Sequence, residues 1–535
     1  MKSNDEKQPR PAVTTKGSAA GQKPQNPDNW RETIESIVVA FVLAFLFRTF
    51  EAEAFVIPTG SMAPTLYGQQ RDVTCTQCGT RFACGVSSGP ATDAELRDGG
   101  RDDRGKDAGL QIVPRDRSQF AICPNANCRF PNNILDHEMF AGDRILVNKF
   151  PFEFKDPERW DVVVFKFPEQ AKTNYIKRLA GMPGEELRIE DGDVKVRKIG
   201  GSDMSYRVAR KTPEKQRHLQ LLVHDNDHPA NQLLEAGWPE AWAKVEASAW
   251  NADAKARSFR VDPHATDSEE WHWLRYSHYV PKAEDWTLVL DGKAPPQPTP
   301  QLIRDFYAYN SRITVGEAES AWRRGELPDL HGNSNEPDQW VGDLTLTCRV
   351  EVLASGGELR IELVEGKRRY WCTIDLASGR GRFEYVHDLD REGEDPRPAG
   401  EPFETGMNRP GKYAVSFANV DDRLCLWIDD RLVKPLDFDP GSKFEPQIPP
   451  VRSSDRDTAP VGIAARMATL RVDHLKIERD IFYRHEPGGI NEAHEKKFVL
   501  NQDENDPAND EFLMLGDNSP RSNDSRLWAQ SHAVP

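Results

Sequence analysis

The residues that could carry covalent chemistry begin with Ser61, shortly after an apolar segment, and Lys177, well downstream of it. A serine hydroxyl attacks an amide only when a base removes its proton, and a lysine serves as that base only in its neutral form. Burial in an apolar site would have to lower the lysine pKa from about 10.4 to roughly 7–8. Tyr175, Ile176 and Leu179 surround Lys177 in a strand-like run, so its amine can point into a dry site. The two residues are therefore a candidate nucleophile and general base, although a lone lysine on such a strand is usually a surface residue.

Four cysteines form a second candidate site. Two residues separate Cys75 from Cys78, and four separate Cys123 from Cys128. Two such turns favour a zinc ribbon, in which four thiolates surround one ion, although the interval between the pairs is longer than usual. Two disulfides are the alternative if this segment lies outside the cytoplasm, and free thiols are the third possibility. The remaining cysteines are expected to be spare or core residues: Cys84, Cys348, Cys372 and Cys425.

An apolar stretch at residues 34–50 precedes the serine. As a helix it spans about 25 Å, inside the range for a membrane helix. Lysines and arginines outnumber acidic residues before it, so the positive-inside rule places the N-terminus in the cytoplasm and everything after residue 50 outside. We expect a retained anchor because the polar stretch before it is long. A cleaved signal peptide, suggested by Ala52-Glu53-Ala54, is the alternative.

Composition limits the classes of function. At 535 residues the chain is too long for one core, so two to four domains are expected. The formal net charge of −16 excludes a general nucleic-acid binder, which needs a basic surface, so no nucleic-acid partner is expected. Only 38% of the residues are hydrophobic, so most of the mass lies outside the bilayer.

Hydrophobic periodicity predicts a mainly β fold. Leu344, Leu346 and Cys348 alternate with polar residues, and similar short runs recur up to about residue 482 with Asp and Gly at the turns. This spacing is typical of a β-sandwich. Asp191-Gly192 lies between two alternating runs and predicts a hairpin turn.

Several stretches resemble the sequence boxes of type I signal peptidases, the Ser/Lys peptidases of family S26. They follow the family order behind an anchor of the family type, and on this basis the chain is identified as a member. The resemblance implies a membrane-bound serine endopeptidase that removes N-terminal signal peptides. The matching stretches are residues 55–66, 142–147, 159–166, 174–184 and 516–526.

Position within these boxes implies the role of each residue. Ser61 is the expected nucleophile and Lys177 the general base. The Thr59 hydroxyl and the Ser61 backbone N–H form the expected oxyanion hole, in which one donor is typically worth about 3–4 kcal/mol. Ser522 is expected to hydrogen-bond the Lys177 amine and orient it.

Other residues are expected to support the site. Asp524 and Arg526 form an ion pair that braces it, together with Asp517. The resemblance also implies a wall that shields the lysine from water and small apolar substrate pockets. The residues expected to form the wall are Tyr175, Phe165 and Met514. Those expected to line the pockets are Val56, Ile57 and Pro58.

Small pockets imply cleavage after small residues such as alanine. The implied partners are the signal peptides of exported preproteins and the lipid bilayer. The implied location is a bacterial-type cytoplasmic (inner) membrane, crossed once, with the catalytic domain outside. Catalysis needs no cofactor, so a structural zinc at the four cysteines is the one metal expected.

The chain departs from the family pattern through large inserts. Residues 336–482 resemble a concanavalin-like (laminin-G-like) β-sandwich, which could bind a glycan or protein ligand or be an inert elaboration. Family members usually continue with another strand after the last box, whereas this sequence stops at Pro535, which puts activity in question. The alternative functions are a catalytically inactive, membrane-anchored glycan- or protein-binding scaffold and a self-cleaving regulator.

The expected fold is thus mainly β, with one N-terminal transmembrane helix, a split catalytic β-domain, a small Cys-rich zinc-ribbon-like insert and a β-sandwich insert. The expected parts are a disordered cytoplasmic tail (1–30), the transmembrane anchor (31–50), the first catalytic part (51–67), the Cys-rich insert (68–135), the second catalytic part (136–199), an insert of unassigned fold (200–335), the sandwich (336–482) and the third catalytic part (483–535).

Overall fold

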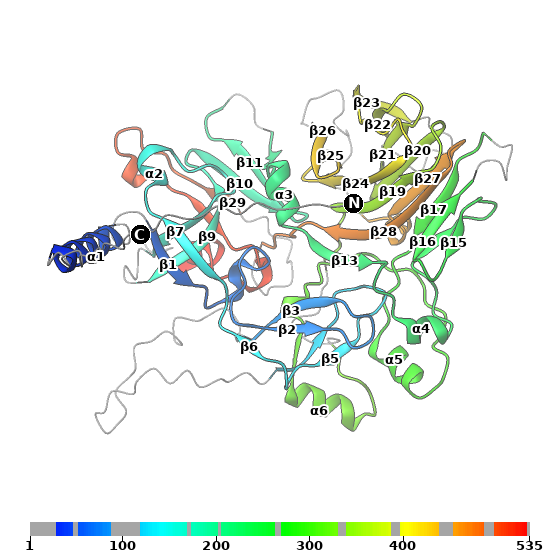
Figure 1. The fold of residues 1–535 in the computed structure, drawn as a ribbon, viewed down its shortest axis with the longest axis horizontal. Coiled ribbons are helices and arrows are strands. Elements are labelled where there is room, and N and C mark those ends of the chain that lie inside the picture. Colours follow the sequence, from blue (N-terminus) through cyan, green and yellow to red (C-terminus); the bar gives the residue numbers. More distant parts are fainter. Residues whose placement is uncertain are drawn as a thin grey trace, which may run out of the picture. The chain divides into compact units, whose positions relative to one another are not determined.

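A computed structural model describes most of the chain (Figure 1). The described residues are 28–46, 52–86, 118–167, 173–201, 205–262, 269–329, 339–386, 396–437, 453–485 and 497–531. Within them the strands form seven sheets, so the prediction of a mainly β fold is confirmed. Most of the expected disordered tail and the polar middle of the Cys-rich insert lie outside the described residues.

The chain divides into two compact units, and the smaller one comprises Met1–Ala54 and Leu146–Lys155. Its helices are α1 (Asp28–Leu46) and α2 (Pro151–Phe154). Helix α1 covers most of the expected anchor at residues 31–50, whose last four residues lie outside the described part. Among the helices that the structure describes, none is both long and apolar enough to span a bilayer. The predicted transmembrane helix is therefore not confirmed.

The larger unit contains small sheets, one of which includes the lysine box. Strand β9 (Asn174–Gly181) is the central strand between β8 (Val162–Lys166) and β30 (Leu513–Leu515), so the lysine box lies beside the strand that leads into the last box. A second sheet has the order β12-β11-β10-β29. Its central hairpin turns at Asp191-Gly192, where φ is 54° and 95°, as this dipeptide predicts. The strands of this second sheet are β12 (Arg207–Val208), β11 (Asp193–Lys198), β10 (Glu185–Glu190) and β29 (Lys497–Val499).

Two large antiparallel sheets form the predicted β-sandwich (Figure 1). Alternate residues of β19 (Leu344–Val352) are buried in its core, as the hydrophobic periodicity predicts. The first sheet contains β15 (Asn251–Asp253), β16 (Ser258–Val261), β28 (Leu470–Arg479), β19, β24 (Gly411–Val420), β25 (Arg423–Ile428) and β26 (Arg431–Asp437), with β13 (Leu221–Asp225) also paired to β28. The second contains β14 (Trp242–Lys244), β17 (His272–Tyr276), β27 (Val461–Arg466), β20 (Glu358–Glu365), β21 (Arg368–Asp375), β22 (Arg380–Val386) and β23 (Arg397–Glu404).

The boundary expected at residue 336 needs correction. Strands β13 to β17, all within the segment of unassigned fold, complete the two sandwich sheets. Their few residues carry too little periodicity to be recognised without their partners. The sandwich therefore begins near residue 221.

The Cys-rich insert consists of two hairpins, each with a cysteine pair at its turn. The first hairpin is β2 (Gln70–Thr74) with β3 (Arg81–Gly85), and the second is β4 (Ser118–Ile122) with β5 (Pro131–Asn133). Strand β18 (Arg312–Thr314), from far along the chain, pairs with β4. The turns pack against residues of α4 (Asn231–Glu235) and α5 (Ala283–Leu290). Other elements are β1 (Ala52–Val56), β6 (Met139–Phe140), β7 (Arg144–Asn148), α3 (Pro213–His218), α6 (Val315–Arg323) and α7 (Ser525–Ser531).

Candidate active site

Ser61 lies in a single 3₁₀ turn, Gly60–Met62. Asn518 holds this turn from the last box: its Nδ2 donates to the Gly60 carbonyl at 3.0 Å, and its backbone N–H donates to the Ser61 carbonyl at 3.0 Å. Gly60 cannot carry a side chain, because a Cβ there would lie 2.2 Å from the Tyr309 ring. Residues distant in sequence therefore fix the position of the serine.

Lys177 extends from the central strand β9 toward this turn. Its Nζ lies 3.0 Å from Ser61 Oγ and donates to the Ile176 carbonyl at 3.0 Å. Burial lowers the pKa of Lys177 to about 8, against the opposing effect of the Asp524 and Asp517 carboxylates. A lysine in this environment can hold a neutral amine near physiological pH, beside a hydroxyl that it could deprotonate.

Aromatic side chains surround the lysine strand. The Tyr175 ring centroid is 5.4 Å from Lys177 Nζ, and Phe165 packs against Tyr175 with ring centroids 6.3 Å apart. Trp528 of α7, which was not among the predicted residues, lies edge-on to Tyr175 at 5.5 Å. Met514 is buried on β30, opposite Leu179 of the lysine strand.

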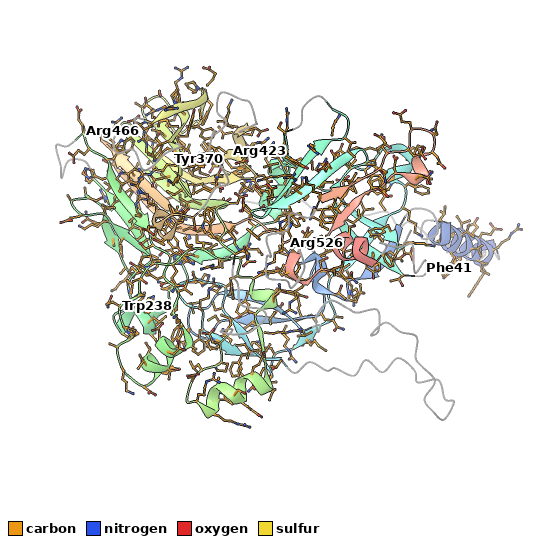
Figure 2. The ribbon with its side chains drawn as sticks, turned by 180° about the vertical axis from the view of Figure 1, so that it is seen from behind. Phe41, Trp238, Tyr370, Arg423, Arg466 and Arg526 are labelled. Atoms are coloured by element: carbon orange, nitrogen blue, oxygen red, sulfur yellow. The ribbon has the colours of Figure 1, made fainter. Side chains whose placement is uncertain are left out.

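The ion pair expected between Asp524 and Arg526 is present and fully buried, with Arg526 Nη2 2.6 Å from Asp524 Oδ2. Asp524 Oδ2 also accepts a hydrogen bond from the Gly516 backbone N–H at 3.0 Å. Arg526, labelled in Figure 2, donates from Nη1 to Ser519 Oγ at 2.7 Å and to the Arg484 carbonyl at 2.7 Å. The pair therefore braces the backbone of the last box.

Asp517 has a different partner from the one expected. Both of its carboxylate oxygens accept hydrogen bonds from the Arg178 guanidinium, at 2.6 Å each, inside the protein. Thr65 donates its hydroxyl hydrogen to Asp517 Oδ2 at 2.5 Å and accepts from Arg178 Nη2 at 3.0 Å. This network joins the serine segment, the lysine strand and the last box. Arg178 was not predicted to be a site residue. Its position next to Lys177 in the sequence was the signal that could have indicated it.

Ser522 does not make the predicted hydrogen bond. It is buried, yet its Oγ has no hydrogen-bond partner among the described residues. The hydroxyl packs on Gly516, where an added Cβ would lie 2.1 Å from it. The Lys177 amine contacts Ser61 and the Ile176 carbonyl instead.

Ser61 and Lys177 open into a cleft that includes the predicted Thr59, Ile57 and Pro58. Val56 is not part of its lining and is half exposed. The inserts contribute residues that were not predicted, because the positions of these residues depend on strand pairing across the chain. The other lining residues are Gly60, Gly85, Thr173, Asn174, Tyr175, Ile176, Tyr309, Asn310, Arg312, Asn518, Arg521 and Asn523.

A separate cluster lies at the two hairpin turns of the Cys-rich insert. The sulfurs of Cys75, Cys78, Cys123 and Cys128 all lie within 4.8 Å of one another, and all four residues are buried. None of the four forms a disulfide in the structure. The four sulfurs thus have the arrangement of a metal-binding tetrathiolate.

Comparisons with known proteins find similarity to signal peptidases. The signal peptidase family, peptidase S26, matches residues 125–238, which include Lys177. The probable signal peptidase I-2 of Synechocystis sp. is 26% identical over 274 residues, covering 46% of this chain and 89% of that protein. The signal peptidase I of Pseudomonas fluorescens is 38% identical over 72 residues, covering 11% of this chain and 25% of its own length. That of Rickettsia bellii is 26% identical over 157 residues, covering 29% of this chain and 36% of its own length.

Solved structures match this chain only weakly. The carbohydrate binding module CBM66 from Bacillus subtilis has a TM-score of 0.24 and 12% identity, covering 44% of this chain and 95% of that one. The galectin LEC-6 of Caenorhabditis elegans has a TM-score of 0.18 and 7% identity, covering 25% and 83%.

A buried lysine beside a serine that opens into a cleft, together with these matches, defines the class: the chain is a serine peptidase. Within that class it is similar to the type I signal peptidases of family S26.

Proposed function

We propose that this chain removes the N-terminal signal peptides of exported preproteins, with Ser61 as nucleophile and Lys177 as general base. The observation that carries the proposal is the 3.0 Å separation of Lys177 Nζ from Ser61 Oγ in a buried site.

The reaction follows from this geometry. Neutral Lys177 takes the Ser61 proton as Oγ attacks the scissile carbonyl, and the resulting oxyanion is held by the Ser61 backbone N–H and the Thr59 hydroxyl. The protonated amine then gives its proton to the leaving amine, which completes an acyl-enzyme on Ser61. Water, deprotonated by Lys177, hydrolyses the ester and restores the serine.

The cleft supports a preference for small residues before the cut. Ile57 and Pro58 line the cleft together with Ser61, and the Tyr309 ring leaves no room for a side chain at Gly60. A methyl side chain fits beside such walls, whereas a larger one has to displace them. A preprotein with an A-x-A site is therefore the expected substrate class.

A membrane tether is part of the proposal. Eight large apolar side chains of α1 are exposed, among them Phe41 (Figure 2), so the helix has an apolar surface that lipid could cover. The basic N-terminal segment would remain in the cytoplasm and the peptidase outside, on a bacterial-type cytoplasmic membrane. Enzyme and signal peptide would then share one bilayer, which raises their effective concentration.

The test is cleavage of an A-x-A preprotein by the detergent-solubilised full chain. Ser61→Ala and Lys177→Ala should each reduce kcat by several orders of magnitude. Lys166→Ala, an exposed lysine on the neighbouring strand, is the matched control and should leave kcat unchanged. A folded wild type that fails to cleave, or a Lys177→Ala variant as active as Lys166→Ala, contradicts the proposal.

A further inference from the structure

The four clustered cysteines have the spacing of thiolates around one metal ion. The Cys75 and Cys128 sulfurs lie 3.6 Å apart, and those of Cys78 and Cys123 lie 3.5 Å apart. Sulfurs at the corners of a tetrahedron, each about 2.3 Å from a central zinc, are about 3.8 Å apart. A disulfide requires about 2.05 Å, so the arrangement matches a zinc tetrathiolate and not two cross-links.

The surroundings of the cluster also suit a structural site. Trp286 and Trp238, both buried, pack against the thiols and separate them from water. Trp286 Nε1 donates to the Cys128 carbonyl at 2.6 Å, and His228 Nδ1 lies 3.1 Å from the Cys78 carbonyl. All four positions are filled by cysteine, which leaves no open coordination position for catalysis.

Each cysteine turn is joined directly to the substrate cleft. Strand β3 leaves the first turn and ends at Gly85, which lines the cleft and has no room for a side chain beside the Tyr309 ring. Strand β4 leads into the second turn and pairs with β18, where Arg312 lies opposite Ala121. The Ile122 backbone N–H, next to Cys123, donates to Ser311 Oγ at 3.0 Å.

The segment held by these strands contacts the serine turn. The side chains of Asn310 and Asn518 exchange two hydrogen bonds, at 2.7 and 2.9 Å, and Asn518 in turn bonds the Gly60 and Ser61 carbonyls. A continuous set of contacts therefore runs from the cysteine turns to the nucleophile.

We propose that Cys75, Cys78, Cys123 and Cys128 bind one zinc ion, and that this ion fixes residues 309–312 as a wall of the substrate cleft. The ion joins the two hairpins at their turns and has no part in the hydrolysis. Zinc binding is independent of the proposed function. Only the role of the cleft as a substrate site rests on the proposed function.

Metal content and thiol count test the site without any activity measurement. The full chain purified with zinc should contain about one zinc per molecule, and Cys123→Ser should lose it. Cys84→Ser is the matched control, because this buried cysteine is in the same insert but outside the cluster, so its zinc should remain. Denatured with chelator and without reductant, the chain should show all eight of its thiols. Four thiols would indicate two disulfides, and eight thiols without bound zinc would leave the cysteines unliganded; either result overturns the site.

Hydrogen exchange tests the coupling to the cleft. Removal of zinc from the full chain by a chelator should accelerate exchange of the β18 amides at residues 312–314, while amides of the sandwich strand β19 stay protected. Unchanged exchange at β18 overturns the coupling. Because neither readout requires hydrolysis, failure of the peptidase assay alone would reject the proposed function and leave the zinc site standing.

Discussion

The burial of Lys177 predicts the dependence of peptidase activity on pH. The residue is 4% exposed, and burial lowers its pKa to about 8. Since only the neutral amine can accept the Ser61 proton, kcat/KM should rise about tenfold per pH unit below pH 8 and level off above it. At pH 7 about 9% of the molecules carry the neutral amine, compared with about 0.04% for a lysine with the ordinary pKa.

The assay is the initial rate of cleavage of an A-x-A peptide or preprotein between pH 6 and 9.5. The rate at pH 7 should be about one tenth of the plateau. Intrinsic tryptophan fluorescence over the same range checks that the enzyme stays folded. A rising limb centred near pH 10 would refute the lowering of the pKa by burial, and a rate independent of pH would refute lysine as the base.

Three further predictions concern the network around the site. Lys177→Met should stabilise the protein against urea by about 3 kcal/mol at pH 7 while abolishing cleavage. This gain in stability persists below pH 8 and disappears as the pH rises toward 10.4. The reason is that the folded wild type binds fewer protons than the unfolded wild type only between these two pH values. Arg178→Met leaves the Asp517 carboxylate buried without its cation, so the free energy of unfolding should fall by about 3–5 kcal/mol. Asn310→Ala and Asn518→Ala should each reduce kcat/KM, and the double variant should lose less than the sum by about 0.5–3 kcal/mol, because each single variant already removes both hydrogen bonds between the two amides.

Controls for these predictions come from the same chain. Arg380→Met breaks an ion pair with Glu404 whose side chains are 68% and 73% exposed, so its effect should stay below about 1 kcal/mol. Equal losses for Arg178→Met and Arg380→Met would contradict the importance of the buried pair. A Lys177→Met variant no more stable than wild type would mean that the Lys177 amine is hydrated in the folded protein. Additive losses in the Asn310→Ala and Asn518→Ala variants would show that the two asparagines act independently, which would contradict the coupling of the insert to the serine turn.

Local patterns were sufficient for much of the fold. The alternation in β19 and the Asp191-Gly192 turn depend on neighbouring residues, and both were predicted correctly. The proximity of Ser61 and Lys177 followed from the family resemblance, because no local pattern measures a distance across more than a hundred residues.

Features that depend on tertiary pairing were not accessible from the sequence. Arg178 is one of the 70 lysines and arginines of the chain, and only its position opposite Asp517 reveals it. The cleft residue Tyr309 lies in a segment without clear periodicity, and its place depends on the pairing of β18 with β4. The hydrogen bond expected between Ser522 and the Lys177 amine is absent because the Ser522 hydroxyl packs on Gly516.

The contact between Asn518 and the Gly60 carbonyl also bears on the time at which the enzyme becomes active. The two residues are 458 positions apart, so the serine turn has its final support only after the last box has been synthesised and folded. At roughly 5–20 residues per second, a ribosome needs about 20–90 s to cover that interval. During this time the sheet that contains Lys177 is incomplete, because β30 forms one of its edges beside β9. With Ser61 as the proposed nucleophile, the order of the boxes along the chain thus delays completion of the site until synthesis is almost finished.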